Sequence, residues 1–523
     1  MNARRPHVAA LLALAIAGCR TDAPAPSGSV LPPTTLPAAT QATTLAGKLH
    51  EILNRHADSG ATVSARVVDP ETGEELFAQD ATRPVIPASN MKLTVTSAAL
   101  DFFGPDAVFE TDLAIVGDDL YLIGHGDPGT GDDQIEAKYQ REPTTLIEKW
   151  VEELKAKGIT QVKGDLRYYD GAFDRKQTHP SWGNDLNEWY AAPVSGLNFN
   201  DNCIDAIASP SPIEGQPPSV EVIPETTDTV VVQNRATSAT SRPAMRSAST
   251  ATTTPATTRA SGDTIDWSRE QTQNVYAITG TVSKVTKLQS KPVTDPGAFF
   301  ADAVRTLFAK RGITIAGKIV RADAPPTGTM TKLAPAQTRF VDILARINKN
   351  SQNMMAEGAA KKLGREFLAM RARVTDPSKL VGSWENADTA VRDFFARNDI
   401  DATGLQFVDG SGLSRQNRVT TKLISDILLT MYRKPYFQTF KGSLGISGVE
   451  GTTRNRLKDL PNRVFCKTGY IGGVRSLSGY VLTDGGKLRV FSFIYNKIPG
   501  GGIGATRPFE DLQDEALRLL MKD

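Results

Sequence analysis

The spacing of apolar residues predicts the first folded segments of the chain. Apolar residues recur with a helical period over residues 45–56, at Leu45, Leu49, Ile52 and Leu53. Apolar and polar residues then alternate from residue 62 to residue 78 around a turn at residues 69–73, which indicates a β-hairpin. The folded part of the chain is therefore expected to begin near Thr44 with a helix and a hairpin.

Three strands and a helix are expected at the opposite end. The strands cover residues 464–468, 475–483 and 487–495, and turns that contain glycine join them. The final helix carries on its apolar side Phe509, Leu512, Leu517 and Leu520. A helix, a hairpin, a long middle, three strands and a helix together indicate one α+β domain that contains both ends, with the middle inserted into it.

We therefore expect one domain made of residues 44–113 and 330–523, with an inserted domain or domains over residues 114–329. Within the insertion, residues 236–262 contain no acidic residue, and Ala, Ser and Thr supply 20 of these 27 residues. Such a segment has too little apolar surface to offset the entropy lost on ordering. It is expected to be a disordered excursion between strands near residues 230–233 and 276–282.

Residues 1–19 have the pattern of an export signal. Two arginines precede an apolar run over residues 8–16, which is too short to cross a bilayer as a mature helix. The next residues, Ile16-Ala17-Gly18-Cys19, resemble a bacterial lipobox, in which the cysteine receives a lipid. We expect a signal peptide over residues 1–18, a Pro/Ala/Thr tether over 19–43, and a lipid anchor at Cys19 on the periplasmic side of a membrane. An ordinary secretory signal is the alternative.

Composition and charge exclude several classes of protein. Hydrophobic residues make up 40% of the 523 residues and charged residues 23%, as in ordinary globular chains. Lys and Arg number 60 against 58 Asp and Glu, and two of the arginines lie in the signal, so nothing points to nucleic acid. A neutral surface also leaves the lipid as the contact with the membrane. The five histidines lack metal-ligand spacing and C-x-x-C is absent, so no metal site is expected. The serine chemistry of the motifs described next needs neither a metal nor an organic cofactor.

Three short motifs carry residues suited to serine chemistry. They are S-x-x-K at Ser89–Lys92, S-x-N at Ser351–Asn353 and K-T-G at Lys467–Gly469, and each occurs once. At a helix start, residues three apart lie on one face, which brings Lys92 near Ser89. A serine hydroxyl needs a base to become a nucleophile, and a lysine serves when burial or a neighbouring cation lowers its pKa.

Each motif alone has an ordinary structural explanation: a helix cap with a surface lysine, a polar turn between helices, or the end of a strand. The combination favours a catalytic interpretation, because the motifs occur in a fixed order and lie at a helix start, an interhelical turn and a strand end. Closely similar motifs are typical of class A β-lactamases and penicillin-binding proteins.

Further segments narrow the resemblance. They are Phe407–Ser414 with Asn417, Gly448–Thr452 through Leu457, Ser476–Tyr480, Gly124–Pro128 and residues 184–202. From about residue 45 to the C-terminus, the chain resembles the D-alanyl-D-alanine carboxypeptidase/endopeptidase family, the class C low-molecular-mass penicillin-binding proteins. The resemblance implies an α+β, penicillin-recognising serine transpeptidase/β-lactamase-like domain, with additional domains inserted between the S-x-x-K and S-x-N motifs.

The resemblance also implies an activity: hydrolysis of the D-Ala-D-Ala end of peptidoglycan stem peptides, or of their cross-links, with β-lactams as inhibitors. Ser89 would attack the carbonyl of the penultimate D-Ala, with Lys92 as the base, aided by Lys467. Ser351 would pass a proton to the leaving amine. The expected substrate-binding residues are Asn353, Thr468, Gly469 and Tyr470, and the backbone N–H groups of Ser89 and Tyr470 would hold the oxyanion.

One residue departs from the family pattern. The family usually carries Thr or Ser after K-T-G, where the hydroxyl helps to bind the terminal carboxylate, but this chain has Tyr470. Its side chain cannot make the same short contact, whereas its backbone N–H is kept. We therefore expect cleavage of cross-links to be at least as strong as removal of a terminal D-Ala.

Two other functions and one covalent link stay open at this level. A β-lactamase or esterase would use the same site but lose its acyl group rapidly to water. A non-catalytic peptidoglycan-binding lipoprotein would keep the fold without the reaction. Cys203 and Cys466 either form a disulfide, which export permits, or remain two buried thiols.

Overall fold

The computed structural model describes residues 44–239, 263–270, 272–376 and 379–522. The expected signal peptide, the tether, the lipidation site Cys19 and most of the Ala/Ser/Thr-rich segment (240–262) lie outside these residues.

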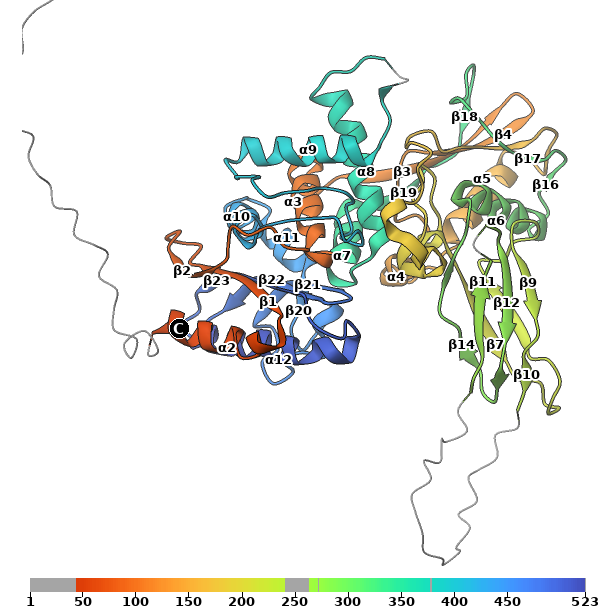
Figure 1. Cartoon of the computed structure of the whole chain (residues 1–523). Helices are drawn as coiled ribbons and strands as arrows, with labels where there is room; N and C mark the ends of the chain where they lie inside the picture. The colour runs from red at the N-terminus through yellow and green to blue at the C-terminus, as the bar shows by residue number, and fades with distance from the viewer. Residues whose placement is uncertain (1–43, 240–262, 271, 377–378, 523) are drawn as a thin grey trace, which may run out of the picture.

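Both ends of the chain form one antiparallel sheet of six strands (Figure 1). The order across the sheet is β2-β1-β23-β22-β21-β20. The strands are β1 (Thr62–Val68), β2 (Glu75–Gln79), β20 (Gly445–Ile446), β21 (Val464–Ile471), β22 (Val474–Leu482) and β23 (Leu488–Asn496). The register places Val67 opposite Phe491 across β1 and β23. The hairpin and the three C-terminal strands predicted from the sequence are thereby confirmed.

Helices cover both faces of this sheet. On one face lie α2 (Leu45–Leu53) and α12 (Ile503–Met521), which bury Leu49 and Leu517 against Phe493 of β23. On the other face lie α3 (Lys92–Phe103), α7 (Phe340–Lys349), α8 (Asn353–Met370), α9 (Trp384–Arg397), α10 (Thr421–Tyr432) and α11 (Phe437–Ser443). The arrangement of helices on an antiparallel sheet confirms the expected α+β class.

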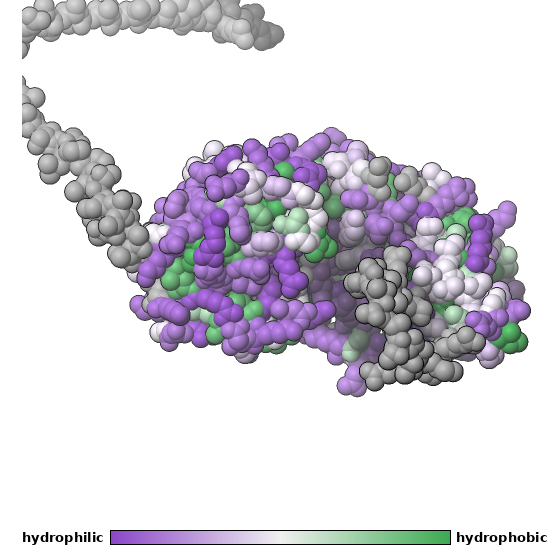
Figure 2. Space-filling model, turned by 60° about the horizontal axis from the view of Figure 1, so that its bottom comes forward, coloured by the Kyte–Doolittle hydropathy of each residue, from purple (hydrophilic) through white to green (hydrophobic). Residues whose placement is uncertain are grey.

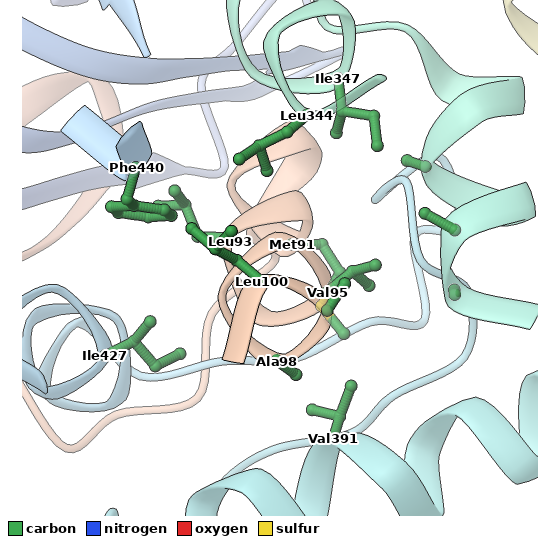
Figure 3. Packing of buried hydrophobic residues seen from close by; sticks show 14 of the residues in the cluster. Met91, Leu93, Val95, Ala98, Leu100, Leu344, Ile347, Val391, Ile427 and Phe440 are labelled. Atoms are coloured by element: carbon green, nitrogen blue, oxygen red, sulfur yellow. The ribbon is translucent and has the colours of Figure 1, made fainter. Parts of the chain in front are cut away.

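Helix α3 lies at the centre of the second layer. Its residues from Lys92 to Leu100 are all buried, because neighbouring helices pack around it on several sides. Figure 3 shows Leu344, Val391, Ile427 and Phe440 from those helices directed toward α3. The helix that follows Ser89 is thus held rigidly by packing, which fixes the position of its first turn, the 3₁₀ helix η2 (Ala88–Met91).

A second sheet is formed by the segment between the first two motifs. Its order is β17-β6-β4-β3, with β18 and β19 also paired to β3. The strands are β3 (Val108–Val116), β4 (Asp119–Gly124), β6 (Leu166–Tyr169), β17 (Ile319–Arg321), β18 (Thr331–Lys332) and β19 (Ala336–Arg339). The sheet therefore begins before residue 114 and ends after residue 329. Helix α6 (Pro296–Lys310) packs on this sheet with α5 (Thr145–Ala156) beside it, whereas α4 (Asp133–Lys138) packs on α7. Beside the sheet, β5 (Gln161–Val162) pairs with β16 (Thr314–Ile315).

A group of smaller sheets extends from this region, seen at the lower right of Figure 1. The pairings are β7 with β8, β14 and β15, β12 with β9 and β11, and β10 with β13. Their bounds are β7 (Cys203–Ser209), β8 (Ser219–Ile223), β9 (Val231–Asn234), β10 (Thr237–Ser238), β11 (Asp266–Arg269), β12 (Val275–Thr279), β13 (Thr281–Val282), β14 (Thr286–Lys287) and β15 (Lys291–Pro292). Three short 3₁₀ helices, Pro180–Asn187, Trp189–Ala191 and Asn200–Asn202, lead from the second sheet into this group.

Among the described residues, no helix is both long and apolar enough to span a membrane. The face seen in Figure 2 is mainly hydrophilic, with scattered hydrophobic patches. Cys203 and Cys466 are both buried and both free thiols, and they belong to different hydrophobic clusters. The disulfide left open by the sequence is therefore absent, and each cysteine serves as a small apolar side chain.

Candidate active site

Ser89 lies in η2, and Lys92 begins helix α3. The turn is held against the sheet because Ser476 Oγ of β22 donates a hydrogen bond to the carbonyl oxygen of Pro87 at 2.7 Å. The residue before the serine, Ala88, has a φ of +47°, which is uncommon for a residue with a Cβ. Backbone strain of this kind persists only where the surroundings enforce it, and it gathers at functional sites.

The side chain of Lys92 is fully buried and makes three short contacts. Its Nζ lies 3.0 Å from Ser89 Oγ, 2.6 Å from Asn353 Oδ1 and 2.6 Å from the carbonyl oxygen of Ser411. A neutral amine has two hydrogens and one lone pair. Because the amide oxygen and the carbonyl oxygen only accept, they take both hydrogens, and the lone pair is left for the hydroxyl of Ser89.

The charge state of Lys92 follows from its surroundings. Burial lowers the pKa of Lys92 to about 7, whereas the nearby carboxylates of Glu357 and Asp409 act to raise it. Burial is the largest of these effects, so the lysine exchanges its proton near neutral pH.

Ser351 and Lys467 form a second polar pair. Ser351 lies in the turn between α7 and α8 and has a φ of +61°, and Lys467 lies on β21. Lys467 Nζ donates to Ser351 Oγ at 2.9 Å and to the carbonyl oxygen of Thr468 at 2.8 Å. Burial and, second, the charge of Lys92 hold the pKa of Lys467 well below its usual value. The structure thus joins the S-x-N and K-T-G motifs across 116 residues of chain.

Gly469 allows β21 to run directly beside the turn that carries the serine. A Cβ at this position would lie 2.1 Å from Ser476 Oγ and 2.9 Å from the backbone nitrogen of Ser89. Only glycine fits such an approach. The third motif therefore supplies backbone next to the serine as well as the lysine.

The side chains of the two residues on either side of Gly469 form hydrogen bonds with residues outside the motif. Thr468 Oγ1 donates to Thr452 Oγ1 at 2.7 Å, and Tyr470 Oη donates to the carbonyl oxygen of Gly501 at 3.2 Å. The Tyr470 hydroxyl is thereby bound to the segment before α12. It does not take the place of the threonine or serine hydroxyl usual in the resembling family.

A buried loop over residues 409–414 packs against the serine turn. Gly412 has a φ of +84°, and a Cβ there would lie 1.8 Å from the carbonyl oxygen of Ala88. Asp409 closes the loop, because Oδ1 accepts from the N–H of Gly412 at 2.8 Å and Oδ2 accepts from that of Ser414 at 2.6 Å. The indole of Trp182, from the inserted region, donates to the same Oδ2 at 2.9 Å. The insertion therefore helps to hold a loop of the catalytic region.

Glu357 on α8 is a buried carboxyl group in contact with the same loop. Its oxygens accept from the N–H of Gly410 at 2.9 Å, the N–H of Ser411 at 2.8 Å and Trp384 Nε1 at 2.7 Å. Burial raises the pKa of Glu357 to about 7, against the effect of these donors. Because the carbonyl of Ser411 binds Lys92, Glu357 fixes one of the two acceptors that orient the lysine.

A cavity of about 250 Å³ opens beside Ser89. Its lining combines hydroxyl groups with one cation and one carboxylate, from residues Ser89, Ser351, Thr452, Thr468, Gly469, Tyr470, Arg475 and Glu510. Such a lining suits a polar, charged ligand. Among residues 44–239, 263–270, 272–376 and 379–522, no cluster of His, Cys, Asp or Glu side chains is arranged to hold a metal ion.

Comparison with known proteins decides the family. The profile of the D-Ala-D-Ala carboxypeptidase 3 (S13) family matches residues 45–507. The chain belongs to this family. It is 28% identical to the D-alanyl-D-alanine carboxypeptidase of Actinomadura sp. (strain R39) over 482 residues. This match covers 87% of this chain and 81% of that relative. It is 23% identical to the D-alanyl-D-alanine carboxypeptidase DacB of Haemophilus influenzae, over 67% of this chain and 68% of that protein.

The fold agrees with the S13 assignment. The crystal structure of penicillin binding protein 4 (dacB) from Haemophilus influenzae superposes with a TM-score of 0.69 at 22% identity, covering 90% of this chain and 99% of that one. The expected family and the penicillin-recognising fold are confirmed. As an S13 peptidase, the chain is a serine-type D-Ala-D-Ala carboxypeptidase of the penicillin-binding class.

The residues singled out from the sequence are brought to one place. All three motifs meet, and the cavity is lined by Ser89, Ser351, Thr468, Gly469 and Tyr470. The sequence interpretation did not include Glu357 or Arg475. A signal for Glu357 exists, since it follows Asn353 by four residues and therefore lies on the same face of α8.

Proposed function

We propose that this S13 peptidase hydrolyses the D-Ala-D-Ala end of peptidoglycan stem peptides, and their cross-links, through an acyl-enzyme on Ser89, and that β-lactams inhibit it by acylating the same serine. One observation carries the proposal. Lys92 Nζ lies 3.0 Å from Ser89 Oγ, and two acceptors, Asn353 Oδ1 and the Ser411 carbonyl, occupy its hydrogens. This arrangement makes a lysine a base and a serine a nucleophile.

In the first step, Ser89 Oγ attacks the carbonyl of the penultimate D-Ala while its proton passes to Lys92. The oxyanion is held by the backbone N–H groups of Ser89 and Tyr470. Supporting this, Gly469 brings β21 into contact with the backbone nitrogen of Ser89. Each such donor stabilises the transition state by roughly 3–4 kcal/mol in comparable hydrolases.

In the second half of the step, the proton that Lys92 took from Ser89 passes through Ser351 to the leaving amine and the C–N bond breaks, which leaves Lys92 neutral again. Lys467 donates to Ser351 Oγ, so the serine hydroxyl hydrogen is free to point toward the amine. Asn353 Nδ2 donates one hydrogen to the carbonyl of Tyr190 at 2.7 Å and keeps a second for the amide on the acyl side of the substrate. Lys467 and Thr468 lie where they would attract the terminal carboxylate. Water then attacks the acyl-serine in the reverse of these roles, with Lys92 again as the base.

The proposed site of action is the periplasmic side of a bacterial membrane. The supporting features are the lipobox-like Ile16–Cys19 and the near-equal numbers of basic and acidic residues, 60 and 58. With no excess of positive charge, a lipid at Cys19 is the proposed anchor.

The proposal is tested by intact mass after incubation with penicillin. One penicillin per chain is expected, on the proteolytic peptide that contains Ser89, and none when the protein is denatured beforehand. A stable adduct with slow turnover supports a peptidase, whereas rapid turnover of nitrocefin would identify the β-lactamase alternative. Absence of any adduct would revive a non-catalytic, peptidoglycan-binding role. D-Ala release from a pentapeptide, compared with opening of cross-linked dimers, then measures the balance of the two cleavages.

The acylation rate is expected to rise with pH through a midpoint near 7. Burial lowers the pKa of Lys92 to about 7, so the amine is protonated and inactive below that pH and neutral above it. The measurement is the second-order rate of penicillin acylation between pH 5 and pH 9, where penicillin itself keeps its charge. A rate that still rises tenfold per pH unit up to pH 9, as a midpoint near the ordinary lysine value of about 10.4 requires, would contradict the role of Lys92 as base.

Glu357→Gln is expected to slow acylation and to move its pH midpoint below 7. The charge of Glu357 raises the pKa of Lys92, so its removal lowers that pKa further. A glutamine also turns one acceptor into a donor that faces backbone N–H groups, which is expected to cost about 1–3 kcal/mol of stability. Glu385→Gln, on the exposed side of α9, is the control. An unchanged midpoint would show that Glu357 acts on the fold alone.

A further inference from the structure

Arg475 is a cation in the wall of the cavity beside Ser89, and no step above uses it. It lies on β22 directly opposite Tyr470 of β21 in the antiparallel register. Its side chain is 13% exposed, so the guanidinium is largely withdrawn from solvent. Burial lowers the pKa of Arg475, but a guanidinium is basic enough to keep its charge in such surroundings.

Three neighbours hold the guanidinium in place. Its Nε donates to Thr506 Oγ1 of α12 at 2.9 Å, and its Cζ lies 4.4 Å from the centre of the Tyr470 ring. Glu510 Oε2 lies 3.8 Å from one terminal nitrogen, which is beyond hydrogen-bond distance. Within the described part of the chain, the two terminal nitrogens donate no hydrogen bond.

Glu510 does not neutralise Arg475 by itself. It is shared with Arg456, whose NH1 lies 3.4 Å from Glu510 Oε1. Arg475 therefore offers two unused donors and an incompletely balanced charge at the cavity. A partly buried guanidinium in this state favours a planar anion that accepts both hydrogen bonds, and a carboxylate is such an anion.

We infer that Arg475 is a specificity residue: its two terminal nitrogens bind the carboxylate of the leaving D-residue. The inference rests on the proposed function. Arg475 thereby supplies the contact that the family usually makes with the hydroxyl after K-T-G. The expectation that Tyr470 weakens recognition of the carboxylate is revised accordingly, because the tyrosine ring supports the arginine that performs it.

The position of Tyr470 explains why the two residues occur together. The ring lies under the guanidinium, and the hydroxyl is bonded to the carbonyl of Gly501. A cation on an aromatic face gains attraction and loses freedom to rotate, so the fork of Arg475 is held ready for its ligand. A threonine at position 470 could bind the carboxylate itself but could not hold the arginine in this way.

The test compares two peptides that differ only in the charge of the last group. One is an N-acetylated peptide that ends in D-Ala-D-Ala carboxylate, and the other is its C-terminal carboxamide. kcat/KM is measured for both by mass spectrometry of the released D-Ala or D-Ala amide. The wild-type protein is expected to favour the carboxylate. Arg475→Gln is expected to lower kcat/KM for the carboxylate by roughly 10- to 100-fold and to leave the carboxamide within about 3-fold, as for loss of a charge-assisted contact.

Three further variants make the result specific. The quantity compared is the ratio of kcat/KM for the carboxylate peptide to kcat/KM for the carboxamide peptide. Arg507→Gln, on the exposed side of the same helix as Thr506, is the control and should keep the wild-type ratio. Arg475→Lys keeps a positive charge without the fork, and its ratio should be intermediate. The double variant Arg475→Gln/Tyr470→Thr should regain part of the preference for the carboxylate, because it restores the family's hydroxyl.

Equal losses for both peptides in Arg475→Gln would overturn the inference, because a merely structural arginine would affect them alike. If Arg475→Gln does not fold, the ratio in Arg475→Lys decides, and an unchanged ratio overturns the inference. A wild-type protein that cleaves neither peptide and takes up no penicillin would overturn the proposed function as well. A wild-type protein that is acylated by penicillin but cleaves the carboxylate and carboxamide peptides equally well would overturn the role of Arg475 alone.

Discussion

Replacing Ser89 by alanine is expected to abolish the penicillin adduct and to lower kcat for D-Ala release by about a million-fold, as when the nucleophile of a comparable serine hydrolase is removed. The reason is that no other hydroxyl has the same surroundings. Lys467 Nζ has one other acceptor among the described residues, the Thr468 carbonyl, so its remaining hydrogen points to Ser351 Oγ and its lone pair does not. The residual rate would come from the oxyanion donors and from binding.

Ser97→Ala is a matched control for this experiment. Ser97 lies on α3, the helix that follows Ser89, is fully buried, and its Oγ has no hydrogen-bond partner among the described residues. Its removal should leave acylation unchanged. An adduct that persists in Ser89→Ala, on any other residue, would contradict the assignment of the nucleophile.

Lys92→Met is expected to lower the acylation rate by about 10²- to 10⁴-fold, the usual contribution of a general base. Methionine has a similar length and no charge, so it tolerates the buried position better than a polar substitute. It removes the lone pair that receives the Ser89 proton. The rate that remains should lose its midpoint near pH 7, since the titrating group is gone.

The control must separate lost catalysis from lost stability. Lys92→Met leaves Asn353 Oδ1 and the Ser411 carbonyl without their donor, which is expected to cost about 1–3 kcal/mol. Lys361 is also fully buried, but it donates to Asp174 Oδ1 and to the carbonyl of Lys176, both at 2.6 Å. Lys361→Met should lower Tm as much while slowing acylation far less. A Lys92→Met protein that keeps a tenth or more of the wild-type rate would exclude Lys92 as the base.

Much of the site could be predicted because its parts are local in sequence. Ser89 and Lys92 are three residues apart at a helix start, and Lys467 to Gly469 lie together in one strand. Each motif can therefore be recognised without tertiary structure. The α+β fold followed from the strands and helices at the two ends. That the motifs would meet in one site could be predicted only from the family resemblance. Sequence spacing alone does not show that residues 116 positions apart, such as Ser351 and Lys467, are in contact.

Arg475 was missed because the strand that ends in K-T-G was predicted to stop at residue 468. The strand continues to Ile471, and a two-residue turn then pairs Tyr470 with Arg475. Extending the predicted hairpin by these residues would have fixed the pairing. The contact of Trp182 with Asp409 had no such signal, because it joins the insertion to a distant loop through side chains alone.

The shared sheet has a consequence for the order in which the protein is made. The Tyr495 hydroxyl donates to the carbonyl of Leu53 across 442 residues of chain, and β23 lies between β1 and β22. The serine segment is synthesised early, yet the surface that holds its turn arrives with the last strands. The strands of the inserted sheet lie closer together along the chain, so that sheet is complete sooner. A growing or truncated chain therefore carries Ser89 and Lys92 without the later strands and loop that hold them in place, so peptidase activity is expected to begin only when those last strands have been made.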